Sequence, residues 1–583
     1  MQNKSIMHLQ RRACMPSPAW DHSVDVLVVG SGLGGMTAAL SAYEMGCKDV
    51  LLVEKAGKFG GTSALSGGVI WIPCNKLARE AGQQDSLEEA HTYLRNTIPD
   101  AIRRDDMLGT YLAHGPKMID FLYEKSHARY TSLSMYPDYH THIAGSKEGN
   151  RALESEPFDS SLLGADNDIV SHSHPIWYLF GIIPLTLTEA NTISVKLKGW
   201  KLLLTKLLAK YAFDLPWRLR SRYDRKRKIG GSHVARLYLS LKERGISMWR
   251  SAPLQELIEE NGRVIGAVIQ RDGKACRVKA RRGVILTAGG FEHNQSMREQ
   301  YLPHPTNARW SAGVKTNTGD AITAGARLGA ATEQMQKGWW CMTCSVPGEA
   351  MPRLMIMEKS VPGTCLVNRN GKRFLNESEN YVTMQDKLYA AHTNETPCAP
   401  AYLIFDARVR RKYIIGPLLT ARTRPDWMLP KRWFSEGMIT KADSLVELAK
   451  KTGINPHHLE ETVAQINRYA VTGKGLDFGR GDSSYDRHYG DPEIKPNPNL
   501  APIIQAPFYA FRLEPGDIGT MGGLVTNMHG QVLRENGEPL EGLYASGNCT
   551  SAILPTYPGP GATLGPAMVF AYQAAKHITG YRD

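Results

Sequence analysis

The sequence predicts an α/β fold that contains a Rossmann-like nucleotide-binding unit. Three observations support this prediction. An apolar run at 24–29 has the composition of a buried parallel strand, and it leads directly into the glycine pattern G-x-G-x-x-G at 30–35. An alanine-rich helix is expected to follow through Ala42, and a second apolar strand at 50–53 ends at Glu54. Strand, glycine turn, helix, strand and acid in this order are typical of dinucleotide binding.

Each glycine of this pattern has a physical task. Gly30 permits the tight turn, Gly32 lets the backbone approach a pyrophosphate, and Gly35 lets the helix pack closely on the strand. The first helical residues, Leu33 and Gly34, offer N–H groups to phosphates at the positive end of the helix dipole. Glu54 is placed to accept hydrogen bonds from ribose hydroxyls. The alternative is a purely structural glycine turn.

Length and composition narrow the class of protein. The chain has 583 residues, too many for one hydrophobic core, so at least two domains are expected. Nine scattered cysteines argue against a disulfide framework, and the single close pair, Cys341 and Cys344, lacks the second pair of a zinc site. Arg11 and Arg12 are followed by no apolar stretch, and no run of 18 apolar residues exists, which favours a cytoplasmic protein without an ordinary membrane-spanning helix.

Further small-residue motifs point to a particular dinucleotide. Lys55 leads into a loop at 60–68 that is able to lie flat along a flavin, and a predicted strand at 283–287 ends in Ala288 and Gly289. Together with a late strand at 542–548, these motifs resemble the flavoprotein family of fumarate reductases and 3-ketosteroid dehydrogenases. The resemblance implies FAD as the cofactor. It also implies a cofactor site formed by Gly30, Gly32, Leu33, Gly34, Gly35, Glu54, Lys55, Gly61, Thr62, Ser63, Ser66, Gly67, Gly68, Ala288, Gly289, Gly547, Asn548, Thr563 and Leu564.

The two ends of the chain must then assemble one FAD domain. We expect a Rossmann-like FAD-binding domain from 20–303 and 515–583, with an inserted α+β catalytic domain at 304–514 and the active site where they meet. Some members of the family attach FAD through a histidine near the glycine loop. No histidine lies between His22 and His91, so FAD is expected to be bound non-covalently and no metal is expected.

The choice within the family depends on the C-terminal half. Dicarboxylate reductases of the family carry a histidine just before a Thr-Met-Gly-Gly-like turn, and here Gly519 occupies that place. In contrast, the run Tyr-Pro-Gly-Pro-Gly at 557–561 closely resembles the carbonyl-binding motif of 3-ketosteroid Δ1-dehydrogenases. The segments 376–381 and 136–139 resemble those that hold this family's catalytic tyrosine and a supporting aromatic pair.

The resemblance implies a role for each of these residues, and the roles make chemical sense. Tyr557 and the N–H of Gly561 would donate hydrogen bonds to a substrate ketone, which stabilises a developing enolate. Tyr381 would remove the C2 proton, and Tyr139 would support the tyrosinate because a phenol with a pKa near 10 is a poor base. Tyr136 is expected in the pocket wall. The family usually continues with an aromatic-Pro-Glu run, whereas His140, Thr141 and His142 follow here, and we interpret both histidines as loop residues.

We therefore predict an FAD-dependent 3-ketosteroid Δ1-dehydrogenase of steroid degradation, with a second, unidentified electron acceptor such as a quinone. The alternative within enzymes is a Δ4-(5α)-dehydrogenase or another flavin ene-reductase, and outside enzymes a flavoprotein partner at a membrane.

The net charge of +13 is concentrated in one segment. Twelve Lys or Arg against two Asp lie between Lys196 and Lys228, inside an insertion at 165–229. An apolar run at 176–185 precedes a helix-period stretch with Leu197, Trp200, Leu204, Leu207, Leu208 and Tyr211 on one expected face. A basic amphipathic helix beside aromatic residues favours an anionic membrane surface. A second basic segment at 408–434 is expected to share this face, on the inner side of the cytoplasmic membrane. A solvated helical hairpin, an oligomer contact and nucleic acid are the alternatives.

Overall fold

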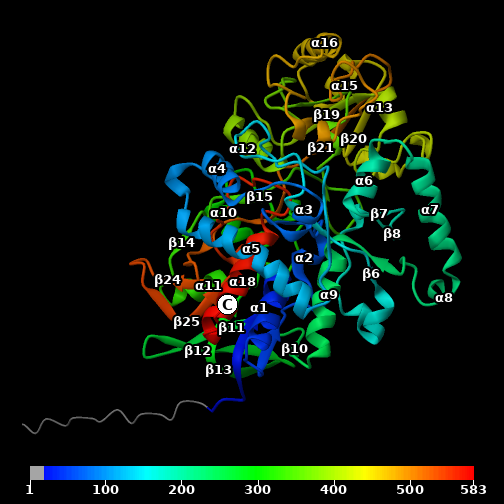
Figure 1. Cartoon of the computed structure of the whole chain (residues 1–583). Coiled ribbons are helices and arrows are strands. Elements are labelled where there is room, and N and C mark those ends of the chain that lie inside the picture. The colour runs from blue at the N-terminus through cyan, green and yellow to red at the C-terminus, as the bar shows by residue number, and fades with distance from the viewer. Residues whose placement is uncertain (1–18, 583) are drawn as a thin grey trace, which may run out of the picture.

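The strands predicted from the sequence form the centre of a large sheet in the computed structural model, which describes residues 19–582 (Figure 1). Strand β1 (His22–Val29) pairs in parallel with β2 (Val50–Val53) and with β13 (Lys274–Leu286), and these contain the strands expected at 24–29, 50–53 and, at the end of β13, 283–287. The eight-stranded sheet has the order β10-β2-β1-β13-β12-β25-β24, and β11 pairs with β12. The remaining strands of this sheet are β10 (Ser247–Trp249), β11 (Leu254–Glu260), β12 (Arg263–Arg271), β24 (Gln531–Leu533) and β25 (Pro539–Ala545). Arg11, Arg12 and Cys14 lie outside the described residues.

The two ends of the chain meet in this sheet. Strand β25 pairs in parallel with β13, so a late segment completes a sheet that the first residues begin. Helix α1 (Leu33–Glu44) packs against α18 (Leu564–Thr579) and α9 (Ile229–Glu243). Nearly every residue of the three helices that faces this contact is buried, because each helix is apolar over most of its circumference. The cofactor domain is therefore discontinuous, as the motifs at both ends predict.

A second region lies above the large sheet in Figure 1 and is built on a four-stranded antiparallel sheet of order β18-β19-β21-β20. Both faces of this sheet are covered. In β19 (Ala401–Asp406), Leu403 and Phe405 pack into one hydrophobic cluster, while Tyr402 and Ile404 pack into another. The other strands and the helices of this region are β18 (Thr364–Val367), β20 (Ile439–Ala442), β21 (Phe508–Leu513), α12 (Tyr381–Ala391), α13 (Ala407–Lys412), α14 (Lys431–Ser435), α15 (Leu445–Thr452), α16 (Pro456–Thr472) and α17 (Ser484–His488).

The hydrophobic clusters change between Cys341, which packs with the large sheet, and Met342, which packs with the small one. Residues between 304 and 341 thus share a core with the cofactor domain. The predicted boundary at 304 stays a prediction. Elements that pack around the large sheet are α2 (Gly61–Leu65), α3 (Lys76–Glu80), α4 (Leu87–Thr97), α5 (Asp105–Lys125), α10 (Gln295–Tyr301) and α11 (Asp320–Arg327), together with β3 (Ile70–Trp71), β4 (Tyr130–Ser132), β5 (Ala152–Ser155), β14 (Thr332–Glu333), β15 (Gly338–Trp340) and β22 (Asp517–Thr520).

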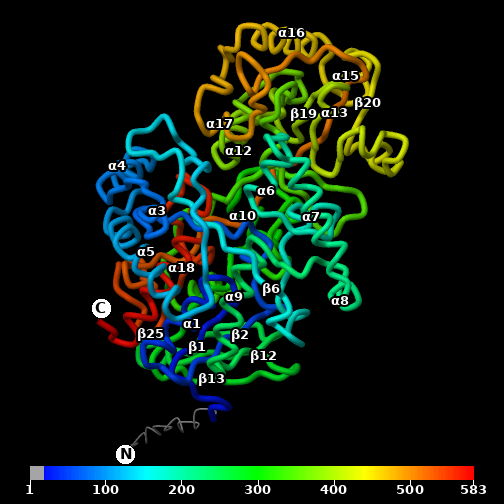
Figure 2. The backbone as a smooth tube through the Cα atoms, turned by 45° about the vertical axis from the view of Figure 1, so that its right-hand side comes forward, coloured from blue at the N-terminus to red at the C-terminus, as the bar shows by residue number. Residues whose placement is uncertain are grey.

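The basic insertion forms a separate lobe, seen at the right of Figure 1 and again in Figure 2. It contains β7 (Tyr178–Leu179), β8 (Ile183–Pro184), α6 (Leu187–Ser194), α7 (Trp200–Phe213), α8 (Leu215–Arg218) and β9 (Lys226–Arg227). Of the residues that the sequence groups on one face of α7, Leu207 is buried and Leu208 is exposed, whereas Leu203, outside that group, packs inward. The reason is that α6 and the hairpin β7–β8 cover only a narrow stripe of α7.

Within residues 19–582, no helix combines the length and the apolar character needed to cross a membrane.

Candidate active site

One large cavity of about 860 Å³ contains almost all of the residues that the sequence singles out. It runs from the carboxyl ends of β1 and β13 to the small region, where Tyr381 and Tyr489 line it. Ligands of open α/β sheets bind in this position, beyond the carboxyl ends of the strands. We call the part beside the glycine turn the cofactor end and the part beside the tyrosines the substrate end.

At the cofactor end, the glycine turn fits a nucleotide because no side chain has room there. A Cβ on Gly30 would collide with the carbonyl of Thr287, and one on Gly35 would collide with the carbonyl of Gly30. Gly30 also has a φ of +104°, which favours glycine. The cap of α1 is Gly32, which has no side chain to satisfy the first N–H groups of the helix. The N–H of Leu33, expected at a phosphate, donates instead to the hydroxyl of Ser63 at 3.1 Å, and the N–H groups that follow it suit a phosphate. The residues present therefore fit a dinucleotide.

Two charged side chains border this end. Glu54 accepts hydrogen bonds from the N–H of Ser31 at 3.0 Å and from its hydroxyl at 2.5 Å, which places the carboxylate beside the glycine turn. Lys55 pairs with Asp320 at 2.7 Å and is half-buried. The predicted cofactor residues that line the cavity are Gly30, Gly32, Gly34, Glu54, Lys55, Gly61, Thr62, Ser63, Ser66, Gly67, Gly68, Ala288, Gly289, Gly547, Asn548, Thr563 and Leu564. Leu33 and Gly35 lie behind this lining, where Leu33 is part of the core and Gly35 allows the helix to approach the strand.

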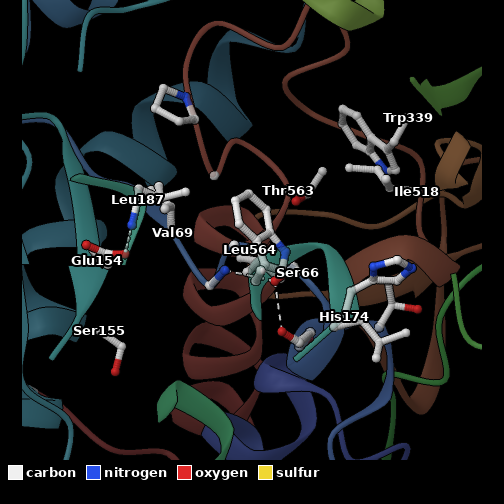
Figure 3. A pocket seen from close by; sticks show the side chains of 18 of the residues that line it. Ser66, Val69, Glu154, Ser155, His174, Leu187, Trp339, Ile518, Thr563 and Leu564 are labelled. Atoms are coloured by element: carbon white, nitrogen blue, oxygen red, sulfur yellow. Dashed lines mark hydrogen bonds between the residues drawn. The ribbon is translucent and has the colours of Figure 1, made fainter. Parts of the chain in front are cut away.

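The loop at 60–68, which lies between the two ends of the cavity, is stabilised by hydrogen bonds of Ser66. The hydroxyl of Ser66 donates to the carbonyl of Ser63 at 2.8 Å and accepts from the N–H of Gly68 at 3.0 Å. Figure 3 shows Ser66 between Leu187 on one side and His174 on the other. A Cβ on Gly67 would touch Trp177 and Leu187 at 3.7–3.8 Å, so the insertion packs directly on this loop.

At the substrate end, three predicted tyrosines from distant segments meet. The hydroxyls of Tyr139 and Tyr381 are 3.2 Å apart. The ring of Tyr557 lies 5.4 Å from that of Tyr139 and 5.5 Å from that of Tyr381. Tyr381 is the first residue of α12, whose cap Asn380 fixes the start of the helix. Tyr136, expected in the wall, also lines the cavity, and its hydroxyl is 3.3 Å from that of Tyr139.

The loop that carries Tyr557 is tied to the segment that carries Tyr139. The carbonyl of Pro558 accepts hydrogen bonds from the N–H of Tyr139 at 2.8 Å and from the hydroxyl of Tyr93 at 2.6 Å. Tyr557 has a φ of +54°, an uncommon conformation for a bulky residue and one that clusters at functional sites. Gly561 has a φ of +91°, and a Cβ there would collide with the carbonyl of Val69. This turn is therefore held in a strained shape by its surroundings.

Burial controls the protonation of the tyrosines. It raises the pKa of Tyr557 to about 12 and the pKa values of Tyr381 and Tyr139 well above the ordinary phenol value. A hydrogen bond from Tyr139 acts in the opposite direction on the pKa of Tyr381. Tyr557 is thus a hydrogen-bond donor at neutral pH, and any negative charge on Tyr381 must be supported by its phenol neighbours.

Several residues of this end were not predicted. Tyr485 and Tyr489 complete the tyrosine cluster, His488 stacks on Tyr136 at 4.7 Å, and Trp339 packs on Tyr557 at 5.4 Å. Their segments carry no motif, and the only available signal was the density of aromatic residues at 485–489. His140 lies in a turn as expected, with its Nε2 3.1 Å from the carbonyl of Thr556.

A network of buried charges holds the segment before Tyr381. The Lys359 ammonium, 1% exposed, donates to the carbonyls of Glu377 and Glu379 at 3.0 and 2.5 Å. Glu377 in turn pairs with Arg373 at 2.6 Å and Arg480 at 3.4 Å, and these partners lower its pKa to about 2. Because buried charges are costly to separate, the network fixes the backbone that positions Tyr381.

The wall of the substrate end is mostly apolar. Leu354, Ile356, Met357 and Ile518 line it, together with Trp339. A histidine at Gly519 would require Asn548 to move, because a Cβ there would lie 2.6 Å from the side-chain nitrogen of Asn548. This lining suits an apolar ring ketone better than a dianion.

The insertion contributes unexpectedly to this wall. His174, Trp177, Leu187, Asn191 and Leu197 all line the cavity. Glu154 fixes the first turn of α6 by accepting a hydrogen bond from the N–H of Leu187 at 2.7 Å, drawn in Figure 3. Burial, aided by repulsion from Glu189, raises the pKa of Glu154 to about 7. The insertion is therefore part of the site as well as a surface lobe.

Comparison with known proteins agrees with this geometry. Residues 25–564 match the FAD binding domain family. A 3-oxosteroid 1-dehydrogenase of Mycolicibacterium smegmatis is 39% identical, covering 95% of this chain and 97% of the relative. A 4-oxocyclohex-2-ene-1-carboxylate 5-dehydrogenase of Sinomonas cyclohexanicum is 34% identical, covering 95% and 93%. The crystal structure of a 3-ketosteroid Δ1-dehydrogenase from Sterolibacterium denitrificans, in complex with 1,4-androstadiene-3,17-dione, is 42% identical with a TM-score of 0.93, covering 96% and 100%.

Proposed function

Because the chain belongs to the FAD-binding family, and within it to the 3-oxosteroid 1-dehydrogenases, we propose that it is an FAD-dependent 3-ketosteroid Δ1-dehydrogenase. It removes one hydrogen each from C1 and C2 of a 3-keto-4-ene steroid and yields the 1,4-diene-3-one. One observation carries this proposal: Tyr381, Tyr139 and Tyr557 converge beside Gly561 in an apolar part of the cavity that continues into the glycine turn.

In the reaction, Tyr557 and the N–H of Gly561 donate hydrogen bonds to the C3 carbonyl oxygen and make the C2 proton more acidic. Tyr381, as the tyrosinate, takes that proton, and the hydroxyl of Tyr139 donates to its oxygen. FAD supplies the acceptor for the hydride that leaves C1. The residues that would hold FAD are the glycine turn, Glu54 and the loop at 61–68. Since no histidine lies between His22 and His91, it is held without a covalent bond.

The test is anaerobic addition of a 3-keto-4-ene steroid to the FAD-loaded protein. We expect the flavin absorbance to bleach and the 1,4-diene-3-one to form. A 4-ene product from a saturated 3-ketosteroid would instead indicate Δ4-(5α) activity. Absence of bleaching with either steroid would contradict the proposal.

A smaller ring ketone is the second candidate, because one relative at 34% identity acts on an oxocyclohexene carboxylate. Such a substrate needs a cation for its carboxylate. Among the lining residues of the substrate end, Arg487 is the one arginine, and it is exposed. Bleaching by 4-oxocyclohexanecarboxylate, but not by a steroid, would favour this candidate.

We also propose that the insertion docks the enzyme on an anionic membrane surface. Helices α7 and α8, with the residue that follows α8, expose apolar side chains of which Leu202 is 75%, Phe213 82% and Leu219 91% exposed. Exposed Lys201, Lys206, Lys210 and Arg220 lie within a few residues of them in the chain. Burial lowers the pKa of Lys196, and repulsion from Lys412 and Arg422 lowers it further, so the second basic segment lies near the start of the lobe. This segment also exposes Trp427. Apolar side chains ringed by positive charge bind the headgroup region of anionic lipid.

This location would be peripheral, on the anionic cytoplasmic face of the membrane. A lipid-soluble quinone is the acceptor we propose, since a docked enzyme would reach it from the bilayer together with an apolar steroid. Sedimentation with anionic vesicles tests docking. Replacing Leu202, Phe213 and Leu219 with serine should abolish it, whereas serine at Val471 and Leu476, which are equally exposed elsewhere, should not. Binding that survives the first variant would contradict docking through α7 and α8.

A further inference from the structure

The two tyrosines that the proposed reaction pairs belong to different regions of the molecule. Tyr381 begins α12 in the small region, whereas Tyr557 lies between β25 and α18 of the cofactor domain. Removal of the C2 proton needs both at once, because Tyr557 binds the ketone while Tyr381 takes the proton. A misplacement of about 1 Å between reacting groups can cost roughly 10²-fold in rate. The contacts that fix one region against the other therefore bear directly on the reaction.

The chain enters the small region through β15 and returns from it through β22, and these two strands pair with each other in antiparallel order. We call them the connecting ribbon. Gly338 and Trp340 both pair with residues of β22, and the pairing continues toward the small region between Thr343 and Glu514. The register shifts between Gly338 and Trp340, at Trp339. Irregularities of this kind re-aim side chains and are common beside active sites.

One tryptophan of the connecting ribbon reaches the tyrosine of the cofactor domain. Trp339 is 3% exposed, and its ring centre lies 5.4 Å from that of Tyr557. Its indole N–H donates to the side-chain oxygen of Asn548 at 3.1 Å, which anchors it to the segment that follows β25. Figure 3 shows Trp339 beside Ile518 of β22. Trp339 therefore ties the ribbon to the part of the cavity where the ketone would bind.

The next residue, Trp340, reaches the helix of the other tyrosine, since successive residues of a strand point to opposite faces. Trp340 is 1% exposed, its indole N–H donates to the carboxylate of Asp386 at 3.1 Å, and its ring lies 5.2 Å from that of Tyr389. Both partners belong to α12. A third residue of α12, Gln385, donates from its side-chain amide to the carbonyl of Gly516 at 2.7 Å, just before β22. Both strands of the ribbon thus hold the helix that begins with the proposed base.

We propose that Trp340, together with Trp339, is a positioning residue that keeps the base on α12 in register with the tyrosine that binds the ketone. This inference rests on the proposed function. Trp339 lines the cavity, whereas Trp340 is not part of the cavity lining within residues 19–582, so it acts through α12. Loss of its contacts should therefore slow removal of the C2 proton and leave the hydrogen bonds from Tyr557 and Gly561 to the ketone intact.

The contact between Trp340 and Asp386 can be broken from either side. Trp340→Phe removes the indole N–H, and Asp386→Leu removes its acceptor at a side chain that is 39% exposed, so the core stays intact. Asp386→Asn keeps an acceptor oxygen and, like leucine, ends the ion pair with Lys337, so it isolates the hydrogen bond. Trp433→Phe is the matched control, because Trp433 is 5% exposed and packs in the small region away from the cavity lining.

The experiment measures anaerobic flavin reduction in the FAD-loaded proteins by a 3-keto-4-ene steroid that is unlabelled, deuterated at C2 or deuterated at C1. In Trp340→Phe and Asp386→Leu, we expect the rate at saturating steroid to fall by about tenfold to 10²-fold. The C2 isotope effect should equal or exceed that of the wild type, and the C1 effect should not exceed it, because proton removal becomes slower. The steroid dissociation constant and the FAD content should not change. Asp386→Asn and Trp433→Phe should resemble the wild type in every measurement.

Three results would overturn the proposal. Wild-type rates in both Trp340→Phe and Asp386→Leu would mean that the base is positioned by other contacts. A rate loss matched by weaker steroid or FAD binding, or by a larger C1 isotope effect, would show general damage to the site. An Asp386→Asn variant as slow as Asp386→Leu would show that the hydrogen bond is not responsible. If Trp340→Phe does not fold, the two Asp386 variants decide. Failure of the wild type to bleach with any 3-ketosteroid would instead contradict the proposed function.

Discussion

The two ends of the cavity are built by different means. At the cofactor end, the contacts come largely from backbone atoms and from glycines that leave space, such as Gly30 and Gly35, and most of the lining residues lie between Gly30 and Gly68. At the substrate end, side chains from four separate segments do the work, and Tyr139, Tyr381 and Tyr557 meet although they are hundreds of residues apart. The nucleotide is therefore recognised through the backbone shape of local segments. The steroid is recognised through side chains that only the tertiary fold brings together.

The contrast between the two ends predicts that the largest loss of activity follows removal of the Tyr381 hydroxyl at the substrate end. Tyr381→Phe should lower the rate of steroid-dependent flavin bleaching by about 10²- to 10⁴-fold, because it removes the proposed base. FAD content, measured by absorbance of the purified protein, should stay at the wild-type level. A variant that still bleaches at the wild-type rate would remove Tyr381 from the mechanism, and one that loses FAD would show that the two ends are not independent.

The wall contributed by the insertion should respond to pH. Burial raises the pKa of Glu154 from 4.5 to about 7, so the folded protein holds a proton that the unfolded chain releases. Stability from this group is present below about pH 4.5 and is lost as the pH rises to about 7. Glu154→Gln keeps the acceptor for Leu187 without the charge. It should therefore be more stable than the wild type by up to about 3 kcal/mol above pH 7, and similar to it near pH 5.

Denaturant unfolding of both proteins at about pH 5 and about pH 8 measures this difference. Other buried carboxyls, such as Glu292, titrate in both proteins and cancel in the comparison. A stability difference that is the same at the two pH values would contradict the assignment to Glu154.

At the cofactor end, we expect FAD binding to be weakened more by a larger side chain than by removal of a charged group. Gly32→Val places methyl groups where the backbone must approach the pyrophosphate, and its Cβ would lie only 3.2 Å from the hydroxyl of Ser63. We expect FAD binding to weaken by roughly 1–3 kcal/mol in titrations of the apoprotein. Gly109→Val, where a Cβ would meet open space, is the control. Equal affinities in the two variants would argue against close backbone approach at Gly32.

The smallest effect is expected for a side chain at the same end. Lys55 pairs with Asp320, and both side chains are 31% exposed. Lys55→Met should change FAD affinity by less than about 1 kcal/mol, because partly exposed ion pairs contribute little. A larger loss would show that Lys55 contacts the cofactor directly, and the contrast between the ends would then be less sharp than we propose.

The same contrast explains what the sequence could predict. The strand at 50–53 and the strand ending at Val29 follow from local patterns, and the structure confirms them. The meeting of both chain ends in one sheet follows from the family resemblance, and β25 does pair with β13. The tyrosines at 139, 381 and 557 are found through family motifs, and their convergence in one cavity could not be worked out from spacing. Tyr489 lacks any motif, so its place in the tyrosine cluster depends entirely on how the small region packs.

The insertion also shows that tertiary contacts cannot be predicted from local sequence patterns. Its charge and periodicity predict a surface element, and the exposed side chains of α7 agree with that. The contact of Trp177 and Leu187 with the loop at Gly67 is a tertiary event between segments about 110 residues apart, for which the sequence gives no sign. The division of the α7 leucines into buried and exposed has the same origin, because the narrow cover supplied by α6 decides which of them are buried.

The double position of the insertion has a practical consequence for protein engineering. Deleting residues 172–228 to obtain a more soluble variant would also remove Trp177, Leu187 and Leu197. These residues form one side of the cavity. Substitution is therefore preferable to deletion. Polar replacements at the exposed positions of α7 and α8 would leave α6 and its hydrogen bond to Glu154 intact, and the cavity wall would be preserved.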